Sequence, residues 1–201
     1  SVRGVRSIVR QHCRNDRSLT YLSGSAGIPL DSSWTLIGHD GWGDAALGDF
    51  DRSPVRLIDF TKIKDFHGLT KGVLYERLRE LGRDAAETLR AELLSALKQE
   101  RNLLIATHVP PFAESCWYEG RNSDPDWLPF FSCGAMGEML LSAAKEYPKR
   151  SFIVLCGHTH HSGIAHICEN LTVLTASAEY GSPSLFEVID TERLKFLDST
   201  G

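Results

Sequence analysis

The chain has 201 residues, of which 42% are hydrophobic and 24% are charged, and its formal net charge is −4. This length is enough for one domain with a sizeable core, and so mild a charge does not indicate the basic surface typical of nucleic-acid-binding proteins. No run of about 18 apolar residues predicts a membrane span, and no charged-then-apolar leader predicts a signal peptide. We therefore expect a soluble protein with no membrane partner and no nucleic-acid surface.

The five cysteines lie far apart and form no CxxC pair. This pattern favours reduced thiols over a disulfide framework, and it predicts a cytoplasmic protein. The chain begins at Ser1 without an initiator methionine. We therefore expect it to be part of a longer protein.

The first half of the chain predicts two helices and one strand. Apolar positions at helical spacing, with arginines between them, predict an amphipathic helix over residues 1–14. The stretch SWTLIGHDGWGDA predicts a strand over 34–38 and then a glycine-rich loop. Asp84 and Glu87 form a plausible capping box, which predicts a helix from Asp84 to about Glu100.

The second half alternates strands and helices, and two of its strands end in histidine. An apolar run over 102–107 leads to His108 and is stopped by the prolines of THVPPF. A helix is predicted over 135–147, and a strand over 152–156 runs directly into GHTHH. Further strands are predicted around 162–168, 171–176 and 184–190, with a final hairpin in VIDTERLKFLD.

This order predicts an α/β sandwich with buried central strands. Ligands of such sheets bind beyond the carboxyl ends of the strands, where His108, His158 and His160 are all placed. In an extended segment, His158 and His160 would project to one side and His161 to the other. Three imidazoles that converge from two strand ends favour a metal site, and we take His108, His158 and His160 as its candidate ligands.

These residues also carry a family resemblance. THVPPF followed by GHTHH resembles the last two motifs of the calcineurin-like metallophosphoesterases, and LIGHDGWGDAALGD is similar to the segment that follows their GNH[DE] motif. The resemblance implies a four-layer α/β/β/α sandwich and a hydrolase of small-molecule or nucleotide phosphoesters. It also implies two divalent metal ions, such as Mn, Fe or Zn, with His108 and His158 on the second metal and His160 on the first.

The acidic half of such a site is absent from the sequence. Two divalent cations about 3.5 to 4 Å apart need carboxylate ligands, which the family supplies through its DxH, GDxxD and GNH[DE] motifs. The DFH triplet at 65–67 follows TKIK rather than a buried strand, and no GNH occurs. We therefore interpret residues 1–201 as the carboxy-terminal portion of one domain whose amino-terminal half is missing, and we assign no catalytic residue.

Several other residues near the predicted strand ends have structural explanations. Asp40, Asp44 and His39 lie in the glycine-rich loop, where such side chains usually hydrogen-bond their own turn rather than a metal or a substrate. The aromatic loop between the histidine motifs could form a wall over a substrate, but packing on the sheet explains it as well. Its aromatic residues are Trp117, Tyr118, Trp127, Phe130 and Phe131.

Two other functions stay open from the sequence. The same histidines could hold a single zinc ion with an open fourth position, and the number of bound metals separates that case from a two-metal site. Alternatively, the chain could be a catalytically silent fragment or interaction module with vestigial histidines. Absence of both metal and phosphoester hydrolysis would favour that interpretation.

Overall fold

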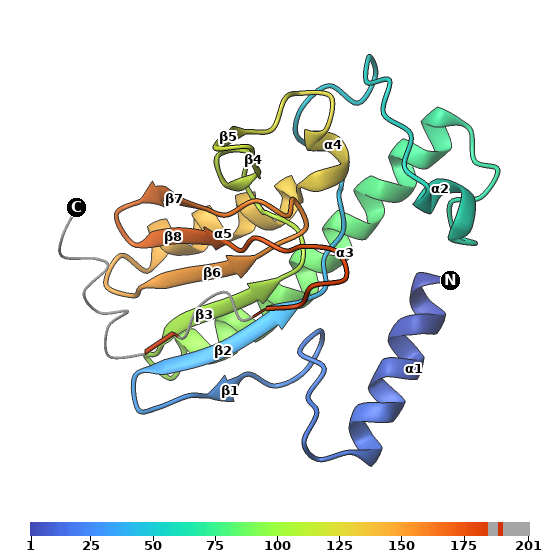
Figure 1. Ribbon diagram of the computed structural model, residues 1–201. Coiled ribbons are helices and arrows are strands. Elements are labelled where there is room, and N and C mark those ends of the chain that lie inside the picture. Colours follow the sequence, from blue (N-terminus) through green and yellow to red (C-terminus); the bar gives the residue numbers. More distant parts are fainter. Residues whose placement is uncertain (185–188, 191–201) are drawn as a thin grey trace.

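Residues 1–184 and 189–190 are described in the computed structural model, which has a six-stranded mixed sheet flanked by helices (Figure 1). Its main helices are α1 (Val2–Asn15), α2 (Asp59–Lys62), α3 (Lys71–Leu97), α4 (Leu128–Phe131) and α5 (Gly134–Glu146). Its strands are β1 (Ile28–Pro29), β2 (Trp34–His39), β3 (Asn102–Thr107), β4 (Trp117–Tyr118), β5 (Arg121–Asn122), β6 (Phe152–Cys156), β7 (Gly163–Cys168) and β8 (Leu171–Thr175). The predicted α/β class is confirmed.

The strand order places the ends of the central strands at one edge. The six-stranded sheet runs β1-β2-β3-β6-β8-β7, with β4 and β5 paired separately as a hairpin. Strands β2, β3, β6 and β8 are parallel, whereas β1 and β7 are antiparallel to their neighbours. The carboxyl ends of the parallel strands therefore share one edge, as the sequence predicted for the strands that lead to the histidines.

Both faces of the central strands are apolar, which explains their continuous hydrophobic sequences. On one face, Ile105 and Val154 pack in a large cluster with residues of α3 and α5. On the other face, Trp34, Leu104 and Ile153 form a second cluster, which contains no helical residue in the described part of the chain. The described residues thus form one helix-backed sheet, and the second sheet of a four-layer sandwich stays a prediction.

Helix α3 begins earlier than predicted. It starts at Lys71, with Thr70 as its N-cap, and Asp84 lies exposed in its interior. The sequence was misleading because Gly82, which normally weakens a helix, lies just before the apparent capping box. Gly82 is required by packing instead, since a Cβ there would lie 2.4 Å from the Cβ of Asp44.

The other predicted elements of the described residues are present with small shifts in their bounds. The predicted strand over 184–190 and the predicted final hairpin lie largely outside the described residues. All five cysteines are free, in agreement with the prediction of reduced thiols. Among the described residues, no helix is long and apolar enough to cross a membrane.

Glu92 is a buried carboxyl group on α3. It is 9% exposed, and its Oε1 accepts a hydrogen bond from the backbone N–H of Gly24 at 2.7 Å. Burial raises the pKa of Glu92 to about 7, although nearby backbone N–H groups act in the opposite direction. The folded chain therefore holds this proton more tightly than the unfolded chain, whose glutamate titrates near 4.5.

We expect Glu92 to make the chain less stable as the pH rises from about 4.5 to 7, because only the folded state then has to lose a retained proton. Glu92→Gln stays neutral, so at pH 8 it should unfold with a free energy higher than that of the parent by on the order of 1 to 3 kcal/mol. The difference should shrink toward pH 5 in urea unfolding experiments. Glu76→Gln, at an exposed position of the same helix, is the control, and an equal effect of both variants would contradict the prediction.

Candidate functional site

Two histidines meet where β3 and β6 end. These strands are adjacent and parallel, and the ring centroids of His108 and His158 lie 4.7 Å apart. The backbone N–H of Gly157 donates to the carbonyl oxygen of His108 at 3.1 Å, which links the two chain segments just beyond the strands. The structure thus brings together two of the three predicted ligands.

The GHTH segment is a tight turn and not the extended segment predicted. His158 and His160 have φ values of 69° and 62°, in the left-handed region. The N–H of Thr159 donates to the carbonyl oxygen of Gly157 at 2.8 Å, which tightens the turn. The prediction of an extended segment was wrong because β6 ends at Cys156, and no strand in the described part of the chain pairs with the residues after it. Left-handed backbone costs a residue other than glycine about 1 kcal/mol or more, and such outliers cluster at functional sites.

His160 and His161 each face a tyrosine. The ring centroid of His160 lies 4.5 Å from that of Tyr180, and the centroid of His161 lies 4.8 Å from that of Tyr118. Within the described ranges, no group of three or more His, Cys, Asp or Glu side chains is arranged to hold a metal ion. A complete metal centre is therefore not formed by these residues in this arrangement, and the ligand roles of His108, His158 and His160 stay predictions.

The two adjacent imidazoles favour their neutral forms. Desolvation lowers the pKa of His158 to about 4, and the neighbouring His108 and His160 act in the same direction. Desolvation also lowers the pKa of His108, with Asp40 opposing the shift and His160 adding to it. A neutral imidazole has one nitrogen with a free lone pair, and this is the form that binds metals.

Asp40 follows β2 at the same edge, but its carboxylate is already saturated. Arg6 of α1 donates to both of its oxygens, at 2.8 and 3.0 Å, and the hydroxyl of Tyr21 donates at 2.9 Å. The hydroxyl of Ser23 lies 3.2 Å from Oδ1. Burial opposes the ionisation of Asp40, but the hydrogen bonds from Arg6 and Tyr21, together with nearby charge, hold its pKa below the usual value. Asp40 therefore anchors α1 to the end of β2.

Asp44 has a structural role at the start of α5. Its side chain is fully buried, and it accepts hydrogen bonds from the backbone N–H groups of Gly134 and Ala135 at 3.0 and 2.9 Å. It also accepts from the N–H of Ala46 in its own turn, as the sequence suggested. These contacts satisfy donors at the amino terminus of a helix, where negative charge is favourable.

The remaining sequence candidates also have structural partners. His39 is 6% exposed, and its Nδ1 accepts a hydrogen bond from the N–H of Gly41 at 2.9 Å. Asp65, from the DFH triplet, accepts from the N–H of Val2 at 2.6 Å. His39 therefore supports its own loop, in agreement with the structural explanation of that position, and Asp65 links α1 to the segment before α3.

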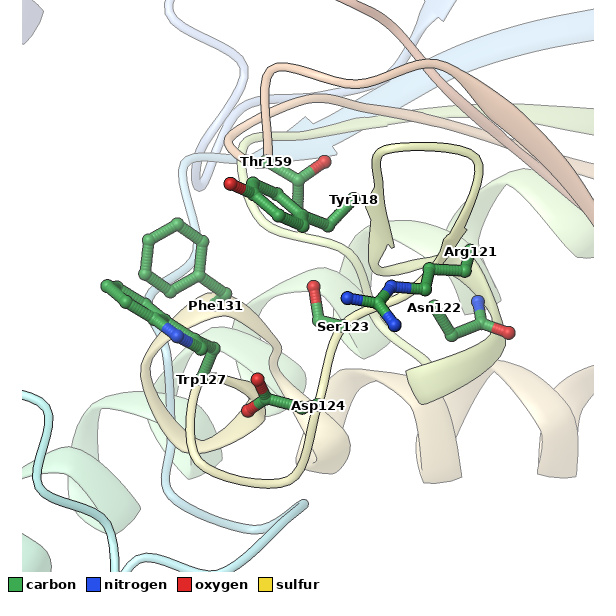
Figure 2. A pocket seen from close by; sticks show the side chains of 8 residues that line it. All are labelled: Tyr118, Arg121, Asn122, Ser123, Asp124, Trp127, Phe131 and Thr159. Carbon is green, nitrogen blue, oxygen red and sulfur yellow. The ribbon is translucent and has the colours of Figure 1, made fainter.

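The aromatic loop divides into a buried part and a part that lines a pocket. Phe130 is 5% exposed and belongs to a hydrophobic cluster, so packing explains it. Tyr118, Trp127 and Phe131 instead line a pocket of about 440 Å³ (Figure 2). The sequence left these two roles open, and only the tertiary structure separates them. The ring centroid of Phe131 lies 4.4 Å from that of His158, so the pocket adjoins the histidine turn.

Comparison with known proteins finds a likeness among solved structures. No family model matches the chain, and no curated protein matches it. The chain is similar to a dimetal phosphatase from Danio rerio, with 14% sequence identity and a TM-score of 0.46. The similarity covers 84% of this chain, which spans 56% of the other chain. A likeness of this size assigns neither a family nor an activity.

The role of Asp44 can be tested by Asp44→Asn. We expect this variant to lose about 1 to 3 kcal/mol of unfolding free energy, because an amide group cannot accept from the N–H groups of both Gly134 and Ala135. Urea unfolding gives the loss, and zinc affinity measured on the folded protein should not change. Asp51→Asn, at an exposed loop position, should leave stability unchanged. Weakened zinc binding with unaltered stability would instead make Asp44 a ligand.

Proposed function

We propose that this chain carries the histidine side of a metal-dependent phosphoester hydrolase site. The observation that supports the proposal most directly is the meeting of His108 and His158, as neutral imidazoles, at the carboxyl edge of a parallel sheet. The strained turn at His158 and His160 adds support, because the fold keeps two costly conformations next to a pocket. The resemblance of THVPPF and GHTHH to metallophosphoesterase motifs gives the chemical class.

In this proposal His108 and His158 would hold one divalent metal ion, and His160, whose ring lies against Tyr180, would hold the other. Bound divalent metal would supply Lewis-acid stabilisation of a phosphoryl group and a more acidic water molecule. The protein's part is to keep these imidazoles neutral at neutral pH, so that each has one nitrogen with a free lone pair, and to hold the two strand ends rigidly together. Rigid placement matters because preorganised groups stabilise developing charge without reorganising.

The acidic ligands are proposed to come from a segment beyond these 201 residues. This follows from charge: three neutral imidazoles cannot offset two divalent cations, and the nearby Asp40 and Asp44 are used by Arg6 and by the start of α5. The proposed partner segment is the amino-terminal half of the same domain. A single zinc ion bound by the histidines alone is the second candidate, and it needs no such segment.

Metal binding is the first test. We expect the purified chain to bind zinc weakly, with His158→Ala and His108→Ala each lowering the affinity about tenfold or more, because each removes one of few ligands. Competition with a chromogenic chelator measures the affinity and the number of bound ions. His67→Ala, at an exposed position away from the edge, should bind as the parent does. Equal affinity in all four proteins would refute the ligand roles.

Hydrolysis is the second test. We expect the chain alone to turn over p-nitrophenyl phosphate or bis-p-nitrophenyl phosphate very slowly with Mn²⁺, because the carboxylate ligands are not supplied. A longer version that includes the upstream segment should gain at least about a hundredfold, since bridging carboxylates complete the two-metal site. Release of p-nitrophenol measures the rate. Fast turnover by the 201 residues that disappears in His158→Ala would place the acidic ligands inside this chain, and no gain in the longer protein would argue for the silent fragment.

A further inference from the structure

The pocket beside the histidine turn has two unlike sides. Aromatic side chains of Tyr118, Trp127 and Phe131 occupy one side, and Arg121 and Asn122 approach from the β4-β5 hairpin on the other (Figure 2). The volume of about 440 Å³ falls within the usual range for small-molecule sites and far exceeds what a phosphoryl group fills. Such a pocket suits a ligand with a flat apolar face and a polar edge.

The aromatic side is available for stacking. Trp127 and Tyr118 are 44% and 47% exposed, although large aromatic side chains usually bury most of their surface. Trp127 is held in place by Phe131, which it meets nearly edge-on, with ring centroids 5.4 Å apart. A ring system that stacks on such side chains gains binding energy with little ordering cost, because the side chains are already positioned.

The polar side of the pocket contains the guanidinium of Arg121, which the described residues leave free to bind a ligand. Asn122 donates its side-chain amide to the carbonyl oxygen of Glu114 at 2.7 Å, so it mainly supports the hairpin. Asp124 accepts from the N–H of Asp126 at 2.9 Å. The guanidinium of Arg121 has no hydrogen bond or ion pair with the residues that the structure describes, and it extends toward Ser123 inside the pocket (Figure 2). It can therefore contact an anion or a polar ring edge.

The pocket is continuous with the histidine turn. Thr159, between His158 and His160, is one of its lining residues. Phe131 contacts the pocket on one side and the ring of His158 on the other, with ring centroids 4.4 Å apart. A ligand whose ring fills the pocket would therefore place a substituent at the strand edge where His108 and His158 meet.

We propose that this pocket binds the base of a nucleotide, so that the phosphoester at the histidine edge belongs to a nucleotide rather than to an alkyl or sugar phosphate. The choice of substrate class rests on the proposed function, but binding of the base does not require metal or hydrolysis. Stacking on Trp127 and Tyr118 supplies the affinity, and Arg121 contacts the polar edge of the base or a phosphate oxygen. A plain aryl ring has no polar edge for Arg121 to contact.

Calorimetric titration of the metal-free chain in EDTA tests the proposal. Adenosine monophosphate should bind about tenfold or more tightly than ribose 5-phosphate, which has the same phosphate but no base, and more tightly than phenyl phosphate. Trp127→Ala and Tyr118→Ala should each weaken adenosine monophosphate about fivefold or more and leave ribose 5-phosphate unchanged. Arg121→Ala should weaken adenosine monophosphate as well. Tyr75→Ala and Arg83→Ala, at exposed positions of α3, are matched controls with no expected effect.

The outcomes separate this proposal from the proposed function. Absence of adenosine monophosphate binding, or equal binding of adenosine monophosphate and ribose 5-phosphate, would overturn the base pocket even if zinc binds at His108 and His158. Tighter binding of phenyl phosphate would replace the nucleotide by an aryl phosphoester. Base-dependent binding that Trp127→Ala removes, in a chain that fails to bind zinc, would support the pocket while rejecting the hydrolase. Thermal melts of Trp127→Ala and Tyr118→Ala confirm folding, which their exposure leads us to expect.

Discussion

The parallel pairing of β3 with β6 is the constraint on which the candidate site depends. Their register pairs Leu103 with Phe152 and Ala106 with Leu155, so the two strands end side by side. Residues separated by some fifty positions in the sequence are thereby joined, and His108 and His158 follow the strands directly. Helices α3 and α5 fix this pairing from one face through the large hydrophobic cluster. A closely packed sheet of this kind holds strand ends more rigidly than loops could.

The carboxylates of Asp40 and Asp44, which follow β2, already make hydrogen bonds that stabilise the fold. Arg6 donates hydrogen bonds to both carboxylate oxygens of Asp40 and so links α1 to the end of β2. Asp44 accepts hydrogen bonds from the backbone N–H groups at the amino terminus of α5. The edge therefore offers neutral imidazoles but few free carboxylates, which is the reason that we assign the acidic ligands of the proposed site to another segment. Both carboxylates are also buried or partly buried. Substituting either residue should therefore lower the stability of the fold, because the groups that it now bonds would lose their partner.

The strained turn and the pocket are neighbours, and together they distinguish this edge from the rest of the sheet. His158 and His160 hold left-handed conformations, and Thr159 between them faces the aromatic pocket. A turn that had only to connect β6 and β7 could use glycine or asparagine at these positions with less strain. The histidines at these positions, next to the aromatic pocket, fit the proposal that the metal site and the base pocket lie side by side.

The sequence by itself determined the α/β class, most of the strands and helices, and the placement of His108 and His158 at strand ends, because hydrophobic periodicity and prolines act locally. It did not determine the start of α3, since Gly82 looks like a helix boundary until the packing of Asp44 against it is known. It also predicted an extended GHTH segment, whereas these residues form a turn, because none of the described strands pairs with the chain beyond Cys156. Only the tertiary structure separated Phe130, which is core, from Trp127 and Tyr118, which line the pocket. Aromatic residues carry no local signal of their burial, because burial depends on which distant segments pack against them.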